Sequence, residues 1–293
     1  LIVELLREGH QVIAALRNAA TKKDKLLGFI ATQGLTDPSI SFVEYDLSHD
    51  FKLDSLLTDA QTKIHVVYHL AASFNWGISK AEAQRTNVKS GLALIEWAAT
   101  LKQLERFIWI GGYRVATPPQ ESADDLYYKY GGYEASKILG HQAFIETCKR
   151  LNVPWTAINP ATVIDGFYTY GDMQYIGIAE MIDKLYQGRL LALPGGSDTF
   201  LPLCNMQYIV SFLIRTISFP ETIAQEYVLL DPATPKCHRL VNLAAEHLGV
   251  STPHLQIPKV LLEKLPEVLL GGSKEQLAFI SNENYHVAET EKM

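Results

Sequence analysis

Strand-like and helix-like segments alternate through the first 165 residues, and this alternation restricts the chain to few folds. The strand-like runs are apolar and rich in β-branched residues, and they occupy residues 11–18, 39–50, 64–73, 104–112 and 153–164. Segments with helical periodicity lie between them, at residues 22–34, 51–60, 81–101 and 133–151. This order predicts an α/β fold with a parallel, doubly wound sheet and right-handed crossovers. In such a sheet, ligands bind at the carboxyl ends of the strands.

The alternation stops near Gly166, where a segment rich in aromatic residues and glycine begins. Further helices are predicted at residues 178–188, 205–217, 235–249 and 256–272. The last of these should be kinked or split at Pro266. We therefore predict a larger α/β domain over residues 1–165. A smaller lobe over residues 166–293 should return some segments to the sheet.

Composition excludes several classes of function. The chain has 293 residues and a formal net charge of −6, and no basic face is obvious, which argues against nucleic acid as a partner. No apolar run reaches the roughly 18 residues that a membrane-spanning helix needs. The three cysteines are widely spaced and form neither a metal-binding pattern nor an even disulfide framework. We therefore expect a reducing, cytoplasmic location and no metal site.

Tyr133 and Lys137 form the most informative pair, in the sequence YEASK. A loop over residues 122–132 is predicted to lead into a helix that starts at Tyr133, and residues four apart share one helix face. A phenol has a pKa of about 10, and a nearby ammonium favours the phenolate and lowers that pKa. A tyrosine tuned in this way can exchange a proton with a carbonyl or alcohol oxygen. The alternative is an ordinary pair on a helix surface.

Several motifs occur in a fixed order and decide between these interpretations: HLAAS (69–73), TNV (86–88), RFIWIGG (106–112), YEASK (133–137) and NPATVI (159–164). Together they resemble the extended short-chain dehydrogenase/reductase family, which includes sugar-nucleotide epimerases, dihydroflavonol reductases and 3β-hydroxysteroid dehydrogenases. The resemblance covers about residues 1–235. It implies a Rossmann-type dinucleotide-binding domain over residues 1–165 and a substrate-binding lobe over residues 166–293.

The resemblance also implies roles for three residues in catalysis. Tyr133 would donate or accept the proton. Lys137 would lower the pKa of Tyr133 and hydrogen-bond the nicotinamide ribose. Asn87 would order backbone and water near Lys137, although an asparagine within a helix without such a task remains an alternative.

Other positions would contact the cofactor. Asp46 and Leu47 would lie at the adenine, Leu70, Ala71 and Ala72 would run along the cofactor, and Pro160 and Val163 would border the nicotinamide. Structural alternatives exist for each group. Asp46 could cap a helix or turn, residues 70–72 could be strand core, and Pro160 could only terminate a strand.

Arg17 bears on the choice of cofactor. It stands at the end of a strand-like run where a carboxylate would bind the ribose 2′-hydroxyl and select NAD. An arginine at this place can bind a 2′-phosphate, so we predict NADP(H), with NAD(H) as an alternative. Arg17 could instead be a solvated loop residue.

The sequence departs from the family pattern twice. The family has a Gly-x-x-Gly-x-x-Gly loop that holds the pyrophosphate, and residues 1–12 resemble the segment after that loop, so we expect a first strand and this loop upstream of Leu1. The family also has Ser or Thr after its fifth strand, where this chain has Gly111 and Gly112. Tyr113, Ser73 or a water would have to replace that hydroxyl, or catalysis would be impaired.

We predict an NADP-dependent oxidoreductase that interconverts a carbonyl and a secondary alcohol on a small, fairly apolar substrate. The candidate substrate residues are Ser73, Phe74, Trp76, Tyr113 and Tyr170, of which the aromatic ones could instead pack in the core of the small lobe. Two alternatives remain: a sugar-nucleotide epimerase or dehydratase, and a non-catalytic NAD(P)-binding sensor or scaffold. The segments 81–101 and 133–151 resemble helices that form a dimer interface in the family, so a homodimer is a further hypothesis.

Overall fold

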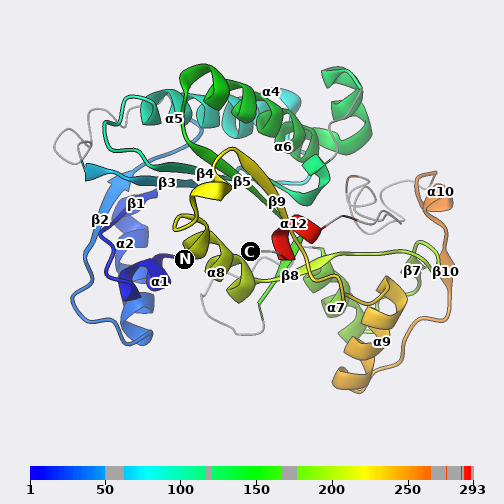
Figure 1. Ribbon diagram of the computed structural model, residues 1–293. Coiled ribbons are helices and arrows are strands. Elements are labelled where there is room, and N and C mark those ends of the chain that lie inside the picture. The colour runs from blue at the N-terminus through cyan, green and yellow to red at the C-terminus, as the bar shows by residue number, and fades with distance from the viewer. Residues whose placement is uncertain are drawn as a thin grey trace.

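The fold is a Rossmann-like α/β arrangement of parallel strands flanked by helices, seen in a computed structural model (Figure 1). The structure describes residues 1–49, 63–116, 121–165, 177–264, 275, 285 and 287–291. The strands of the first 165 residues are β1 (Val12–Leu16), β2 (Ile40–Glu44), β3 (Val66–His69), β4 (Arg106–Ile110), β5 (Trp155–Pro160) and β6 (Thr162–Ile164). The later strands are β7 (Leu193–Pro194), β8 (Leu203–Asn205), β9 (Gln225–Leu229) and β10 (Gln256–Ile257).

Helices alternate with the strands, as the sequence predicts for a doubly wound sheet. In the first 165 residues they are α1 (Ile2–Arg7), α2 (Ala19–Thr32), α4 (Lys80–Ala83), the π-helical turn η2 (Gln84–Lys89), α5 (Ser90–Ala98), the 3₁₀ turn η3 (Tyr113–Ala116) and α6 (Ala123–Leu151). The remaining helices are α7 (Ile178–Tyr186), α8 (Met206–Thr216), the 3₁₀ turn η4 (Pro220–Thr222), α9 (Cys237–Leu248), α10 (Lys259–Leu262) and α12 (Ala288–Glu291).

Every strand pairing in the described residues is parallel. The order β3-β4-β5-β9 forms a four-stranded sheet, so β9 returns from the C-terminal part of the chain to the edge of this sheet. The strands β1 and β2 pair with each other, as do β6 with β8 and β7 with β10. The strands predicted as one sheet thus fall into separate groups, because no ladder of hydrogen bonds joins β1 to β3 in the described part of the chain. The division into domains at residue 165 remains a prediction.

The four-stranded sheet is covered on both faces, which explains why its strands read as nearly continuous apolar runs. Phe107 and Trp109 of β4 face α6, where the ring of Phe144 lies 4.9 Å from that of Trp109 and 5.9 Å from that of Phe107. Ile108 between them points to the opposite face and packs in a core that includes Leu213 of α8. Figure 1 shows α5 and α6 above the sheet and α8 below it.

The helix that carries Tyr133 begins earlier than predicted. Residues 122–132 were expected to form a loop, but α6 starts at Ala123, because Ser122 caps it by accepting a hydrogen bond from the backbone N–H of Asp125 at 3.2 Å. The glycine pair still interrupts the helix, since Gly131 has φ 76° and ψ 179°. Tyr133 therefore stands two residues after a sharp break in a longer helix.

The predicted helix over residues 256–272 is also wrong at its start. Residues 256–257 form β10 beside β7, and the helix α10 begins after Pro258. Pro258 lacks a backbone N–H and precedes the first helical position, so the helix cannot begin before it. The predicted helix at residues 51–60, the kink at Pro266 and the candidate Tyr170 lie outside the described residues.

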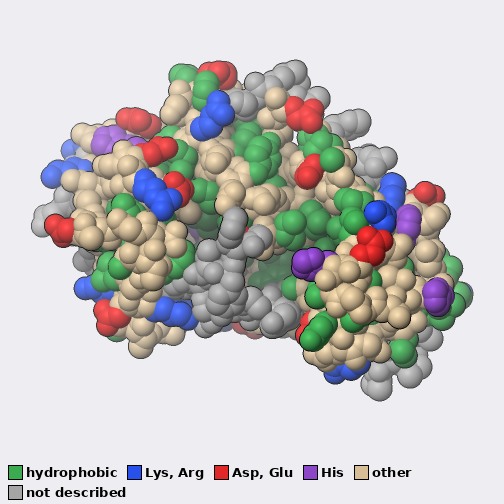
Figure 2. Space-filling view, turned by 90° about the horizontal axis from the view of Figure 1, so that it is seen from below, with side chains coloured by type: hydrophobic (Ala, Val, Ile, Leu, Met, Phe, Trp, Pro, Cys, Tyr) green, Lys and Arg blue, Asp and Glu red, His purple; other side chains and the backbone are tan. Residues whose placement is uncertain are grey.

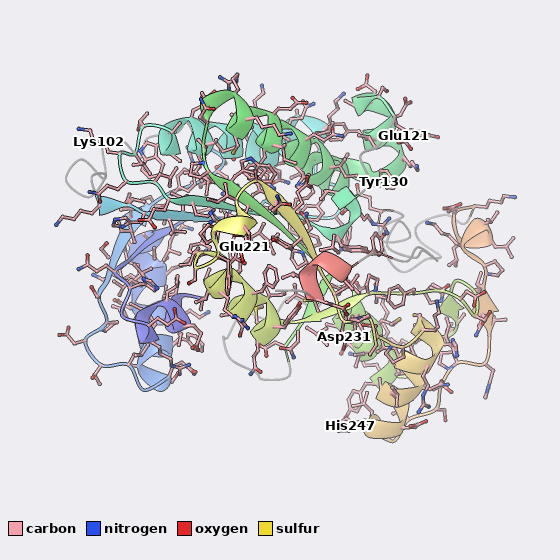
Figure 3. The ribbon with its side chains drawn as sticks, viewed as in Figure 1. Lys102, Glu121, Tyr130, Glu221, Asp231 and His247 are labelled. Atoms are coloured by element: carbon pink, nitrogen blue, oxygen red, sulfur yellow. The ribbon has the colours of Figure 1, made fainter. Side chains whose placement is uncertain are left out.

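The carboxyl ends of the sheet strands point toward the break in α6 and toward the C-terminal part of the chain. Figure 3 labels Glu221 just before β9, Asp231 just after it, and Tyr130 beside the break in α6. Because the sheet is parallel, β3, β4 and β5 end at the same edge. Tyr133 is thereby brought to the edge where ligands bind in doubly wound sheets.

The described residues show how charges, helix hydropathy and thiols are distributed in the molecule. On the face shown in Figure 2, Lys and Arg lie among Asp and Glu and do not gather into one basic patch. None of the helices described here is long and apolar enough to cross a membrane. In the same part of the chain no cluster of His, Cys, Asp and Glu could hold a metal ion, and Cys148, Cys204 and Cys237 are buried free thiols.

Candidate active site

Lys137 is fixed against the end of β4. Its side chain is 9% exposed, and its Nζ donates a hydrogen bond of 2.9 Å to the backbone carbonyl of Ile110. Tyr133 lies one turn before it on α6. The structure thus places the predicted pair at the carboxyl end of a sheet strand and within the protein, which is not the environment of an ordinary surface pair.

Burial dominates the ionisation of both residues. Desolvation, and then the charge of Glu134, raise the pKa of Tyr133, so its phenol is strongly held in the protonated form. Desolvation also lowers the pKa of Lys137 to about 8, and Glu134 opposes this by favouring the ammonium. The sequence predicts that Lys137 lowers the pKa of Tyr133, whereas in this structure the pKa is raised, because burial disfavours the phenolate and the charge of Glu134 acts in the same direction.

Glu134 and Arg114 are buried charges that the sequence did not single out. Arg114 Nε lies 3.8 Å from Glu134 Oε1, and both side chains are less than a tenth exposed. Burial raises the pKa of Glu134, while the charges of Arg114 and then Lys137 lower it. A buried carboxylate beside Tyr133 therefore has two cations near it, and Lys137 is one of them.

Asn87 links the loop after β3 to α6. Its Oδ1 accepts a 2.7 Å hydrogen bond from the Ser73 backbone N–H, and its Nδ2 donates to the Ser73 carbonyl at 3.1 Å and to Ser136 Oγ at 3.0 Å. Asn87 sits in the π-turn η2, a distortion that often marks functional positions. A side-chain carbon at Gly140 would lie 3.0 Å from the Asn87 carbonyl, so glycine lets α6 approach this turn closely.

The ring of Tyr133 packs against an aromatic ring from the loop after β3. The ring of Phe74 lies 4.5 Å from that of Tyr133 in an edge-on arrangement, and the ring of Trp76 lies 5.0 Å from that of Phe74. Ser73 precedes them in the loop that Asn87 holds. Of the candidate substrate residues, Phe74 contacts Tyr133 directly, Trp76 packs against Phe74, and Ser73 is held by Asn87 in the same loop.

Tyr113 is placed differently from these three residues. It is 4% exposed, packs in the core cluster that contains Ile108 and Ile158, and lies with its ring 5.0 Å from that of Tyr285. Its role as a replacement hydroxyl stays a prediction.

Glu275 is a second residue that the sequence did not reveal. Its carboxylate accepts hydrogen bonds from the backbone N–H groups of Gly77 at 3.0 Å and Gly132 at 3.3 Å. These two glycines flank the aromatic cluster, one after Trp76 and one before Tyr133. A carboxylate from far along the chain thus binds both segments that carry the candidate site, a contact that no sequence spacing indicates.

The two glycines that replace the family hydroxyl differ in their surroundings. A side-chain carbon at Gly111 would lie 2.0 Å from Asn159 Oδ1, so Asn159 already occupies that space. A side-chain carbon at Gly112 would meet nothing within 4 Å. Position 112 can therefore accept a serine, whereas position 111 cannot without displacing a fully buried side chain.

The predicted adenosine end of the site lies after β1 and β2. Asp46 Oδ1 accepts hydrogen bonds from Ser48 N at 2.8 Å and Ser48 Oγ at 2.7 Å, so the residue closes a turn as its structural alternative requires. These bonds lower the pKa of Asp46, and Arg17 adds a smaller effect through its charge. Arg17 is exposed and lies close enough to Asp46 to act on it electrostatically.

Glu44 occupies the start of α2 next to Arg17. Its Oε1 accepts from Asn18 N at 2.7 Å and its Oε2 from Ala19 N at 2.6 Å, and Asn18 has the left-handed φ of 57°. A carboxylate bound to helix N-terminal N–H groups is stabilised by the helix dipole. The sequence has no acid at the end of the strand that carries Arg17, but in the structure Glu44 at the end of the neighbouring strand β2 lies at this place.

The remaining cofactor candidates line the same edge. Leu70 is 50% exposed directly after β3, and Val163 in β6 is 41% exposed, so both offer apolar surface to a ligand. Ala71 and Ala72 follow Leu70 with small side chains, Leu47 and Pro160 are half-buried, and Pro160 is the last residue of β5. These strand ends offer exposed apolar surface, small residues and a buried lysine. This combination fits an extended dinucleotide, which Lys137, Leu70 and Val163 would contact.

The site and the fold together are of the kind found in dinucleotide-binding enzymes with a Tyr-x-x-x-Lys pair. A model of the NAD-dependent epimerase/dehydratase family matches residues 1–226. The chain therefore belongs to this family, whose members are enzymes, and the resemblance read from the sequence is confirmed.

Solved structures agree on the fold. The terminal R domain from the myxalamid PKS-NRPS biosynthetic pathway shares 16% identity and a TM-score of 0.73, with 99% of this chain and 80% of that chain covered. The protein gox2253 shares 15% identity and a TM-score of 0.71, with 99% of this chain and 87% of that chain covered. UDP-glucuronic acid 4-epimerase from Bacillus cereus in complex with NAD shares 18% identity and a TM-score of 0.63, with 88% of this chain and 83% of that chain covered. No curated protein sequence matches the chain.

Proposed function

We propose that the protein is an NADP(H)-dependent oxidoreductase that interconverts a carbonyl and a secondary alcohol on a small, fairly apolar substrate. The observation that carries the proposal is the pair Tyr133 and Lys137 at the strand edge, with Lys137 buried and the ring of Phe74 against that of Tyr133. Apolar rings beside a proton donor favour a substrate without a large charged group.

Each residue would have a distinct task in reduction. The nicotinamide, when bound, supplies the hydride. Tyr133 would hold the proton for the substrate oxygen, and burial, which raises the pKa of the phenol, keeps it protonated before the transfer. The ammonium of Lys137 would then stabilise the phenolate that remains. Asn87 would hold the loop at Ser73 against α6 through its hydrogen bonds to both. In alcohol oxidation the same proton would return to Tyr133.

The preference for NADP(H) rests on Arg17, and Glu44 should oppose it. A 2′-phosphate near the start of α2 would be attracted by Arg17 and repelled by the Glu44 carboxylate. We predict that Arg17→Ala weakens NADPH binding on the order of tenfold, the size of a lost charge-assisted hydrogen bond, and leaves NADH binding unchanged. Glu44→Gln should tighten NADPH several-fold through the loss of one negative charge.

Fluorescence titration of the two variants and of Arg17→Lys as a matched control measures these effects. Equal losses for NADPH and NADH in Arg17→Ala would show that Arg17 acts on the fold or on a part common to both cofactors. An unchanged NADPH affinity in both variants would show that the 2′-phosphate does not bind near Arg17 and Glu44.

A sugar-nucleotide epimerase or dehydratase is the second candidate, favoured by the family model and by the similarity in fold to UDP-glucuronic acid 4-epimerase. The test is to supply NADPH with a panel of apolar ketones and aldehydes, and separately to supply NAD with UDP-sugars. Oxidation of NADPH with formation of an alcohol supports our proposal. Interconversion of UDP-sugars without net oxidation of cofactor would replace it.

Two further parts of the proposal concern the state of the protein in the cell. The free thiols of Cys148, Cys204 and Cys237 support a reducing, cytoplasmic setting.

The helices α5 and α6 pack side by side and are the segments that we propose to form a homodimer. An ultracentrifugation run that finds only monomer at micromolar concentration would rule the dimer out.

A further inference from the structure

A buried polar cluster lies one helical turn beyond Lys137. His141, four residues after Lys137 on α6, is 3% exposed, and Asn159 at the end of β5 is fully buried. The two residues come together at Gly111, where a side-chain carbon would lie 2.0 Å from Asn159 Oδ1 and 3.4 Å from His141 Nδ1. Tyr133, Lys137 and His141 therefore follow one another along one face of α6.

The orientation of the His141 ring is fixed from outside. Its Nε2 lies 2.6 Å from Oε2 of Glu226 on β9, and the Glu226 side chain is 44% exposed. A carboxylate accepts, so Nε2 carries the hydrogen of this bond. When the imidazole is neutral, Nδ1 is therefore an acceptor, and it points into the protein.

Three polar atoms of this cluster have no hydrogen-bond partner among the described residues: His141 Nδ1, Asn159 Oδ1 and Asn159 Nδ2. An unsatisfied buried polar atom costs about 1–3 kcal/mol, so native proteins rarely leave several together. Two of the three are acceptors and one is a donor. Water matches this set, since it can donate to Nδ1 and to Oδ1 and still accept a hydrogen bond.

Gly111 connects the cluster to the catalytic lysine. Lys137 Nζ donates to the carbonyl of Ile110, which belongs to the same peptide bond as the nitrogen of Gly111. An ammonium has three donors, and one of them is used here. A water between His141 and Asn159 can accept from a second one.

We propose that His141, held by Glu226, and Asn159 bind an internal water molecule that positions the Lys137 ammonium. Gly111 is glycine because any side chain would displace this arrangement. His141 is then a positioning residue that acts through Lys137. The inference depends on the proposed oxidoreductase function only for the catalytic meaning of Lys137, because the water site itself is independent of turnover.

The first test is a high-resolution crystal structure of the full-length protein. The proposal predicts density for a water about 3 Å from both His141 Nδ1 and an amide atom of Asn159. A direct hydrogen bond between the two side chains, or the absence of a water at Nδ1, would overturn the site.

The second test measures the ionisation of Lys137 by NMR of ¹³Cε-labelled lysine, with its signal assigned by its loss in Lys137→Met. His141→Leu removes the acceptor and should lower the pKa of Lys137 by roughly one unit relative to the wild type, because the ammonium loses a hydrogen-bonded water. His141→Gln restores an acceptor oxygen and should recover part of the shift. The other charged or titratable groups near Lys137 in the described part of the chain include Tyr133, His69 and Glu134 with its partner Arg114, and all variants leave them unchanged.

If His141→Leu does not fold, Glu226→Leu is the second variant, because it keeps the imidazole and removes only the hydrogen bond between His141 Nε2 and Glu226. It should shift the Lys137 pKa in the same direction. An identical Lys137 titration in the wild type and in a folded His141→Leu or Glu226→Leu variant would refute the positioning role. Both readouts remain valid in a protein without turnover, so failure of this inference is distinguishable from failure of the oxidoreductase proposal.

Discussion

Replacement of Tyr133 by phenylalanine should reduce turnover by about 10²–10⁴-fold, the range attributed to a positioned general acid or base. The phenol of Tyr133 is the proton donor that we propose, and the ring contact of Tyr133 with Phe74 does not require the hydroxyl. Phenylalanine therefore keeps the packing and removes the proton. Steady-state kinetics on the best substrate of the carbonyl panel measures the loss.

Cofactor affinity is the control for Tyr133→Phe. The dissociation constant of NADPH, measured by fluorescence, should change little, because phenylalanine fills the same space. A variant that binds NADPH and retains wild-type turnover would mean that another group supplies the proton. If the wild type itself binds the cofactor but transforms no carbonyl, alcohol or UDP-sugar, the sensor or scaffold alternative would be favoured.

A serine at position 112 should raise the catalytic rate, whereas a serine at position 111 should damage the fold. Space around Gly112 is open, and the family places a hydroxyl here that hydrogen-bonds the substrate oxygen. Loss of one such donor costs on the order of 10²–10³ in rate, so its return should give a gain on the order of tenfold or more. Gly111→Ser would push against Asn159 Oδ1 at 2.0 Å and should destabilise the protein by about 1–3 kcal/mol.

The two serine variants form a matched pair, because they differ by one position and add the same group. Urea denaturation followed by circular dichroism reports the free energy of unfolding, and kinetics report the rate. We expect Gly112→Ser to be as stable as the wild type. A destabilised Gly112→Ser or a fully stable Gly111→Ser would show that the end of β4 is arranged differently from this structure.

The alternation of parallel strands with helices could be predicted from the sequence, and so could the place of Tyr133 and Lys137 four residues apart on a helix, because both depend on local pattern. The catalytic role of this pair stays a prediction. Buried parallel strands are read directly from apolar runs such as residues 104–112. Phe74 and Trp76 could be assigned to the site because they follow a strand end, where parallel sheets gather their loops.

The missed contacts depend on helix rotation and on residues far apart in the chain. The bond between His141 and Glu226 joins positions 85 residues apart, and its existence follows from the register of β9 beside β5. Glu44 reaches the start of α2 for a similar reason, since Leu16 and Glu44 are paired neighbours. No periodicity in the sequence encodes such contacts.

The early start of α6 is a different kind of miss, because a signal for it was present. Ser122 followed three residues later by Asp125 is a helix-start pattern, and both aspartates at 124 and 125 favour the first turn. The glycine pair at 131–132 masked this signal, since it also predicts a break. The break is real, but it interrupts a helix that had already begun.

The most direct test of the account is a titration of the full-length protein with NADPH and with NADH, followed by nicotinamide fluorescence. We predict tight binding of NADPH and weaker binding of NADH, with Lys137 and Arg17 contacting different parts of the same cofactor. Binding of neither dinucleotide would contradict the oxidoreductase proposal, however well Tyr133 and Lys137 are placed.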